Sequence, residues 1–205
     1  MKGFTWPVLC SLVVMAGSCT STKITSSWRE PEKEIAVDQI NKVLVVALFQ
    51  NETSRHKAED EMAGYLKGKG VVSYNYLDAN FNERNEDALR DKIRSDGFDG
   101  AVTMRLVDID KEKIYTPGYG APYPFSYRNF SGYYYRSWSF LSTPGYYTTT
   151  KTYTIETNVY SIKEDRIIWS GLTETTNVDG VKAMTEEVVK VVYRKMVKEG
   201  FITNN

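Results

Sequence analysis

The side chains that most often carry enzyme chemistry are scarce in this chain. Its 205 residues include one histidine and two cysteines. His56 stands beside Arg55 and Lys57 at the start of a predicted helix, where we expect a solvated side chain rather than a catalytic base. The sequence has no G-x-S-x-G elbow, phosphate-binding P-loop, H-E-x-x-H or C-x-x-C motif. We therefore predict a protein that is not an enzyme and has no metal and no cofactor.

Acidic side chains leave two chemical alternatives open. Paired carboxylates hydrolyse glycosidic bonds when their separation is correct, but the sequence does not fix that separation. The candidates for such a pair are Glu156, Glu164, Asp165, Glu174, Glu186 and Glu187. Asp108 and Asp110 would share one face of a strand and could bind calcium, although Lys111 and Lys113 would neutralise them. A glycan hydrolase therefore stays as an alternative to a binding protein.

The N-terminal segment has the pattern of an export signal. Lys2 is its only charge, the stretch 4–15 is mostly apolar, and three small residues precede Cys19. The apolar stretch is shorter than the roughly 20 residues that cross a bilayer. The string Val14-Met15-Ala16-Gly17-Ser18-Cys19 resembles the lipobox of bacterial lipoproteins.

This resemblance implies a lipid anchor. Residues 1–18 would be a lipoprotein signal peptide, and Cys19 would carry a diacylglycerol on its thiol and an acyl chain such as palmitate on its amino group. Several acyl chains hold a protein firmly on a membrane. Thr20 and Ser21 do not resemble an inner-membrane retention signal. We therefore expect a location at the cell outer membrane, facing the periplasm.

The aromatic segment 115–147 is the least ordinary part of the chain. It holds nine of the fifteen tyrosines and four of the six prolines, and its only charges are Arg128 and Arg136. Tyrosine and tryptophan offer large contact areas with a polar tip, so this composition is typical of recognition surfaces. We predict a loop that contacts an envelope protein, a cell-wall glycan or the membrane interface. Its expected contact residues are Tyr133, Tyr134, Tyr135, Arg136 and Trp138. The alternative is that these aromatics fold back and complete the domain's own core.

Hydrophobic periodicity predicts an α+β domain. Strands are expected at 42–49, 71–77 and 100–107, helices at 55–69 and 85–95, an antiparallel strand pair at 148–162 and 166–176, and a C-terminal helix at 181–199. The string Asp96-Gly97-Phe98-Asp99-Gly100 is interpreted as a helix end, a turn and the entry to a strand. This order is β-α-β-α-β followed by the strand pair and helix, in one mixed sheet with helices packed on it. Polar residues 19–39 are expected to be a lipidated cysteine and flexible tether, and residues 40–205 a single domain.

The order of elements resembles two periplasmic domains. These are the N-terminal domain of the Tol–Pal propeller protein and the periplasmic domain of the curli secretion lipoprotein. Four strings, KVLVV at 42–46, DGFDGAV at 96–102, ETNVY at 156–160 and IWS at 168–170, also resemble a widespread set of uncharacterised bacterial outer-membrane lipoproteins of Bacteroidetes and proteobacterial type. These resemblances imply the fold and the envelope location, but no activity. The curli resemblance adds self-assembly as an alternative.

Composition limits the class of partner. The 26 Lys and Arg residues balance 26 Asp and Glu residues, so we do not expect binding to nucleic acid. A hydrophobic fraction of 41% with 25% charged residues is typical of a globular domain. The sequence therefore favours a non-catalytic envelope lipoprotein that acts as a binding or scaffolding module through its aromatic loop.

Overall fold

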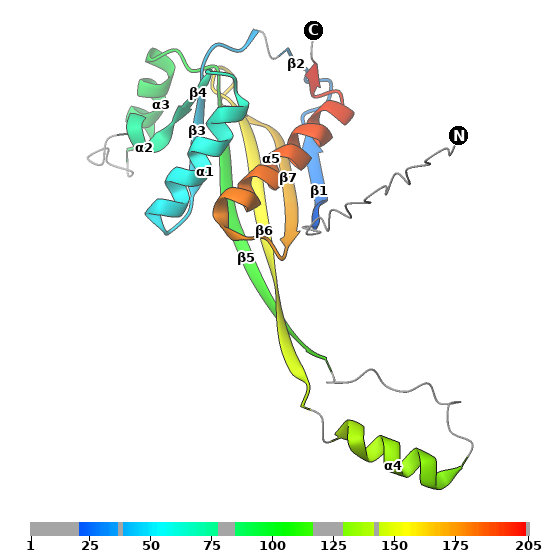
Figure 1. Cartoon of the computed structure of the whole chain (residues 1–205). Coiled ribbons are helices and arrows are strands. Elements are labelled where there is room, and N and C mark those ends of the chain that lie inside the picture. The colour runs from blue at the N-terminus through cyan, green and yellow to red at the C-terminus, as the bar shows by residue number, and fades with distance from the viewer. Residues whose placement is uncertain (1–20, 37–38, 78–84, 117–128, 142–143, 204–205) are drawn as a thin grey trace, which may run out of the picture.

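The computed structural model describes residues 21–36, 39–77, 85–116, 129–141 and 144–203. Its strands are β1 (Ser21–Arg29), β2 (Ile35–Ala36), β3 (Val43–Leu48), β4 (Gly70–Val72), β5 (Gly100–Thr116), β6 (Tyr146–Ser161), β7 (Arg166–Thr176) and β8 (Ile202–Thr203). Its helices are α1 (Glu52–Tyr65), α2 (Ser73–Tyr76), α3 (Glu86–Ser95), α4 (Phe130–Leu141) and α5 (Gly180–Lys198). Figure 1 shows a sheet with helices against it and a long hairpin that leaves the body of the protein.

One mixed sheet organises the molecule. Its strand order is β1-β7-β6-β5-β3-β4, with β3 parallel to both β4 and β5 and the remaining pairs antiparallel. The short strands β2 and β8 form a separate parallel pair. The predicted α+β class and mixed sheet are confirmed.

The two faces of the sheet are covered differently. Helices α1 and α5 pack on one face, and the main core lies between them and the strands. Its buried members include Val45, Ala47, Met104, Ile155, Trp169, Met62, Val188 and Met196. A smaller cluster on the other face joins Leu44 and Ala101 to Ile93 of α3 and to Phe98. Apart from this cluster, residues of β6 and β7 that face away from α5 are half-exposed, as in an antiparallel sheet with one solvated face.

The expected flexible tether is wrong for residues 21–29. They form β1, which pairs with β7 from Ser21 opposite Thr176 to Arg29 opposite Trp169. An edge strand with one solvated face needs few apolar side chains, so hydrophobic periodicity did not reveal it. The folded domain therefore includes residues 21–29, ahead of the expected start at residue 40.

Other boundaries also differ from the sequence prediction. The expected strand at 71–77 is only Gly70–Val72, and the chain then turns into α2. Strand β5 continues to Thr116, well past residue 107. The string at 96–100 has the expected structure, because Gly97 takes a φ of 75° and Phe98 N donates to Ile93 O at the end of α3.

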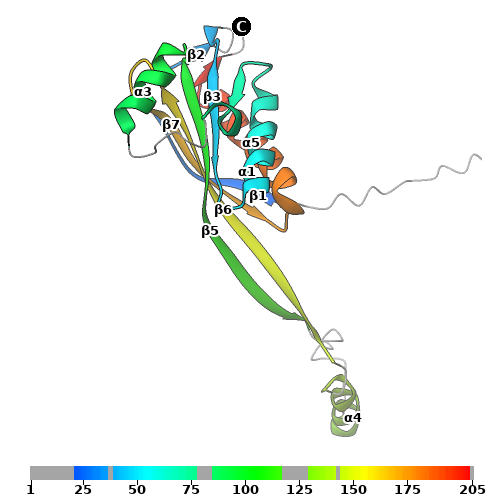
Figure 2. The ribbon, with the colours of Figure 1, turned by 90° about the vertical axis from the view of Figure 1, so that its left-hand side faces the viewer.

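The long hairpin is made by the distal halves of β5 and β6. Asp110, Thr152, Thr176 and Ser21 form one row across four strands. Among the described residues, only β5 and β6 continue beyond this row, paired as far as Thr116 and Tyr146. At about 3.3 Å per residue they project roughly 20 Å past the row. We call residues 108–116 and 146–154 the arm; Figures 1 and 2 show it with α4 at its far end.

Candidate binding surface

Asn129 begins the helix at the end of the arm. Its side-chain oxygen accepts a hydrogen bond of 2.8 Å from Gly132 N, and its carbonyl accepts one of 3.1 Å from Tyr133 N. These bonds satisfy donors that the first turn of a helix otherwise leaves free. Asn129 therefore caps α4, and this local signal fixes where the helix begins although many aromatic residues follow.

Three aromatic rings of α4 form a row along one side of the helix. Phe130, Tyr134 and Trp138 follow each other at intervals of four residues, which places them on one face. Ring centroids are 5.9 Å apart between Phe130 and Tyr134 and 6.2 Å apart between Tyr134 and Trp138. Their exposed fractions are 79%, 56% and 63%. We call these three rings the aromatic row.

The other predicted contact residues lie around this row. Tyr133 and Tyr135 are also exposed, but they lie on neighbouring sides of the helix. Arg136 lies in α4, and its side chain is outside the described part of the structure. Cys19, the signal peptide at 1–18 and residues 117–128 are likewise outside the described residues.

The alternative in which the aromatics complete the domain's own core is wrong for the described residues of α4. Their rings are exposed, and α4 lies beyond the arm rather than on the sheet (Figure 1). At the junction, Tyr115 and Tyr147 pair with ring centroids 5.1 Å apart, and both are exposed. A Cβ atom at Gly145 would lie 2.6 Å from the backbone carbonyl oxygen of Thr116, so a larger residue here would require the backbone to shift. The sequence analysis did not predict a helix within the aromatic segment.

The arm carries opposite charges on its two faces. Direct cross-strand partners share a face, so Lys111, Lys113 and Lys151 lie together on one side, continuous with the side that α5 covers. Asp108, Asp110 and Glu112 lie on the other side, opposite threonines of β6. Among the described residues, none of these six charges forms an ion pair within the chain. We call these surfaces the basic face and the acidic face of the arm.

The carboxylates considered for hydrolysis are each held by a cation. Glu156 pairs with Arg105, Glu174 with Lys23, Asp165 with Arg90 and Arg94, Glu164 with Lys33 and Arg166, and both Glu186 and Glu187 with Lys190. Hydrogen bonds from Lys33 and Arg166 lower the pKa of the Glu164 carboxyl, and one from Lys190 lowers that of Glu186. A general acid needs a raised pKa instead.

His56 and the aspartates of the arm have ordinary surroundings. The His56 ring stacks on Tyr74 with ring centroids 4.0 Å apart. Within the described ranges, no group of three or more His, Cys, Asp or Glu side chains could hold a metal ion. Over the same residues, no helix has the length and apolar character needed to span a membrane.

A buried carboxylate escaped the sequence reasoning. Glu59 of α1 is fully buried and accepts hydrogen bonds from Ala47 N, Ser73 Oγ and Tyr74 N. In the sequence it is one of several acidic residues in the first half of a helix. The one local signal was its spacing of three residues from the apolar Met62, which places the two side chains on the same side of the helix.

No protein-family model and no curated protein matches this chain. Solved structures with a similar backbone include two crystal forms of a PelC dodecamer from Paraburkholderia phytofirmans, each 11% identical, with a TM-score of 0.45 and coverage of 91% of this chain and 99% of that chain. Lipoprotein GNA1162 from Neisseria meningitidis is 10% identical, with a TM-score of 0.39 and coverage of 77% and 98%. At TM-scores below 0.5 these similarities carry no argument about this chain. Its function is therefore inferred from its own residues.

Proposed function

We propose that this protein is a non-catalytic lipoprotein of the cell envelope, anchored through Cys19, that binds a partner with the aromatic row of α4. The observation that carries the proposal is the exposure of Phe130, Tyr134 and Trp138 at the end of the arm. Tyrosine and tryptophan are enriched among residues that dominate binding energies, and a row of rings on one helix face offers a compact contact area.

The position of the anchor supports contact on the membrane side. Ser21 lies in the same row as Asp110, where the arm leaves the body. Cys19 precedes Ser21 by two residues, which is at most roughly 7 Å of chain. The anchor and the arm therefore leave the same end of the sheet, as Figure 1 shows for β1 and the arm. With so short a connection, α4 comes close to the membrane that holds the anchor.

Site-specific photo-crosslinking in living cells tests this proposal. A crosslinking residue at Tyr134 should give a discrete adduct, either with one envelope protein or with lipid. Trp28 is the matched control, because it is an exposed aromatic residue on the body of the sheet. Equal labelling at the two positions, or none at either, would contradict the role of α4. A protein adduct and a lipid adduct distinguish docking to a partner from insertion into the membrane interface.

Self-assembly is a second candidate, favoured by the opposite charges of the arm. A two-stranded ribbon without further layers is only marginally stable in water. If the basic face of one arm packed on the acidic face of the next copy, each ribbon would gain layers and its unpaired charges would gain partners. Such a contact joins two different surfaces, so it would propagate into a ring or a filament.

Charge reversal tests self-assembly directly. Lys111→Glu with Lys113→Glu leaves an arm with two acidic faces, and Asp110→Lys with Glu112→Lys leaves one with two basic faces. Each double variant should sediment as a smaller species than the unaltered protein, and a 1:1 mixture should restore the large species. If both variants sediment like the unaltered protein, the arm is not the interface.

The glycan hydrolase is less well supported by the site. Its six candidate carboxylates are all engaged with lysine or arginine, and the pKa of Glu164 and of Glu186 is lowered rather than raised. Release of soluble sugar from isolated cell wall by residues 20–205, abolished by one carboxylate substitution, would restore this alternative.

A further inference from the structure

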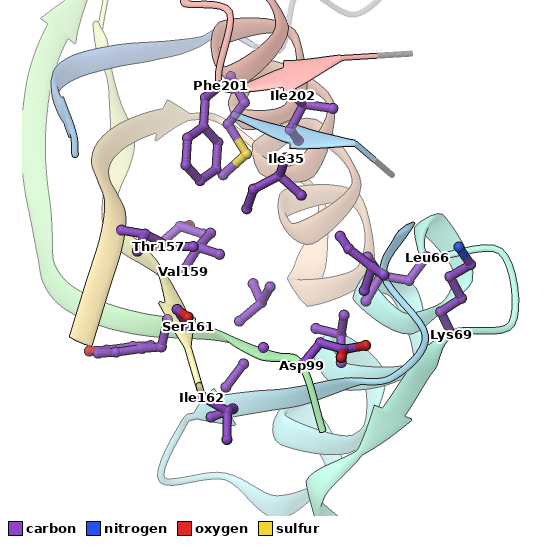
Figure 3. A pocket seen from close by; sticks show the side chains of 18 of the residues that line it. Ile35, Leu66, Lys69, Asp99, Thr157, Val159, Ser161, Ile162, Phe201 and Ile202 are labelled. Carbon is purple, nitrogen blue, oxygen red and sulfur yellow. The ribbon is translucent and has the colours of Figure 1, made fainter. Parts of the chain in front are cut away.

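A cavity opens between the two helices at the end of the sheet opposite the arm. It measures about 1010 Å³ and lies between strands β3, β5 and β6, helices α1 and α5, and the β2–β8 pair. Figure 3 shows Thr157, Val159 and Ser161 on one side, Leu66 and Lys69 on another, and Ile35, Phe201 and Ile202 across its end. The volume is at the upper end of the range of small-molecule sites, about 300–1,000 Å³. We call it the inter-helix cavity.

The floor of the cavity follows from small residues in two neighbouring strands. Val102 and Val159 are cross-strand partners on the helical face, yet both are only half-buried. On the same face Met104 is fully buried beneath the helices. The next pair outward, Gly100 and Ser161, adds almost no side-chain volume. The helices therefore leave the start of β5 and the end of β6 uncovered.

The lining is aliphatic inside and charged at the edge. Met62, Met104 and Met196 contribute flexible, polarisable side chains that adapt to a flexible ligand. The charged lining residues are all half-buried or exposed: Lys33, Glu34, Lys69, Arg94, Asp99, Lys163 and Glu164. Thr157 is 3% exposed, and its hydroxyl is the unpartnered buried polar side-chain atom among the described lining residues. Because its interior offers so few polar groups, the cavity would select a ligand by the ligand's shape and by the apolar area that it buries.

We propose that the inter-helix cavity binds the single acyl chain of an amphiphile. The hydrocarbon tail lies between α1 and α5 on Val102 and Val159, and the polar head stays at the charged edge. A polar ligand of the same volume would leave its hydrogen-bonding groups unpaired against valine, methionine and isoleucine. The site is separate from the aromatic row, because it lies at the other end of β5 and β6.

Binding of a dansyl-labelled undecanoic acid to residues 20–205 tests the proposal. We expect saturable fluorescence enhancement at one probe per chain, and displacement by unlabelled fatty acids. Each added methylene that is buried should tighten the competitor's binding up to about fourfold until the cavity is filled. Absence of saturable binding, or an affinity that does not depend on chain length, would overturn the assignment.

A pair of variants on one strand locates the probe. Val102→Trp fills the cavity and should abolish binding, whereas Val107→Trp, at an exposed position of β5, should leave it unchanged. If the Val102→Trp variant does not fold, Leu66→Trp, at the edge of the cavity, is used as the cavity-filling variant instead. If the cavity-filling variant bound the probe as well as Val107→Trp does, the probe would bind elsewhere and the proposed acyl-chain site would be wrong.

Two further variants separate an acyl chain from other occupants. Thr157→Val keeps the shape of the side chain and removes the hydroxyl, so binding of the probe should be retained. A loss of affinity of tenfold or more would point to a polar ligand instead.

Residues 37–38 stand between the lining residues Ala36 and Gln39 and lie outside the described residues. If the probe bound only to a Val37→Gly variant, the chain itself would fill the cavity and the proposal would be wrong.

Discussion

Glu59 shows how one buried side chain joins several elements. Its carboxylate oxygens accept hydrogen bonds of 3.0 Å from Ala47 N in β3, and of 2.7 Å from Ser73 Oγ and 3.1 Å from Tyr74 N in α2. Hydrogen bonds from several donors are what make a buried carboxylate tolerable in a protein interior. Glu59 therefore fixes α1 against the parallel half of the sheet.

Glu59→Gln is expected to lower the free energy of unfolding by about 2–3 kcal/mol. Glutamine keeps the shape, but its amide NH2 replaces one acceptor and faces either Tyr74 N or the donors of Ala47 and Ser73. Urea unfolding followed by circular dichroism measures the change. Glu61→Gln is the matched control, since Glu61 is half-buried on the same helix and pairs with the exposed Lys182. Equal destabilisation by the two variants would contradict this role for Glu59.

Glu199 has a comparable role at the end of α5. Its carboxylate accepts hydrogen bonds from Ser27 Oγ in β1 and Trp169 Nε1 in β7, and pairs with Lys195. Burial acts to raise the pKa of this carboxyl, but the three hydrogen bonds outweigh it and the pKa is lowered. Glu199 therefore holds the last turn of α5 against strands β1 and β7.

The lowered pKa of Glu199 predicts a dependence of stability on acid. A carboxyl whose folded pKa is depressed stabilises the fold above its unfolded pKa, and this contribution is lost as pH falls through the folded pKa. The Glu199→Gln variant should be less stable than the unaltered protein at pH 7, by about 1–2 kcal/mol. The two proteins should converge as pH falls below about 4.5, the ordinary value for glutamate. Urea unfolding at pH 7 and at pH 3.5 compares them; a constant difference would show that ionisation of Glu199 does not matter.

At the scale of elements, α4 and the arm separate binding from folding. The rings of Tyr134 and Trp138 contact each other and the solvent rather than the core. Their removal therefore takes no apolar area out of the body of the protein.

Tyr134→Ala with Trp138→Ala should leave the melting temperature unchanged and weaken partner binding by about 30-fold or more, the usual effect of removing a residue that dominates an interface. Tyr135→Ala is the control, because Tyr135 is exposed on the same helix but lies off the aromatic row. Thermal unfolding and the yield of the Tyr133 photo-adduct in cells measure the two effects. A double variant that retains the full yield would remove the aromatic row from the binding surface.

The sequence predicted the buried elements well and the exposed ones poorly. Strands β3, β6 and β7 and helix α5 bury one or two faces, so their apolar spacing is visible without neighbours. Strand β1 and the distal half of β5 have solvated faces. In β5, residues 108–113 comprise five charged residues and one isoleucine, so they show no apolar alternation. Their strand structure depends on pairing with β7 and β6, which local sequence does not encode. The helix α4 was hidden because aromatic residues and Gly132 have low helix propensity.

The candidate sites differ in the same way. Composition alone drew attention to the segment 115–147, which holds nine of the fifteen tyrosines, but it did not place Phe130, Tyr134 and Trp138 on one face of a helix. The inter-helix cavity could not be located from the sequence at all, because valines at 102 and 159 look like core residues. Only the paths of α1 and α5 leave them uncovered.

At the scale of the whole molecule, the body should fold without the arm's distal half. Within the described part of the chain, the arm beyond Asp110 pairs only with itself. Lys111 and Lys151 are direct partners, so residues 112–150 can be replaced by Asn-Gly, a two-residue hairpin turn.

This shortened protein should keep its free energy of unfolding to within about 1 kcal/mol, as expected for changes away from the core. It should also retain the inter-helix cavity and bind the dansyl probe normally. Urea unfolding and the probe titration check both points. A large loss of stability would show that the arm contributes to the fold itself. A photo-adduct at Tyr134 would then no longer separate a role of α4 in binding from a role of the arm in folding.

The pairing of β1 with β7 has a mechanical consequence for an anchored protein. The described part of β1 begins two residues after Cys19, the proposed anchor site, and runs along the sheet toward Arg29. If Cys19 carries that anchor, a pull on it along the axis of β1 would load the hydrogen bonds between β1 and β7 together rather than one after another. Stripping β1 from the sheet in that direction would require all of these bonds to slide at once. The pairing of β1 with β7 would then act as a shear joint between the proposed anchor and the rest of the domain.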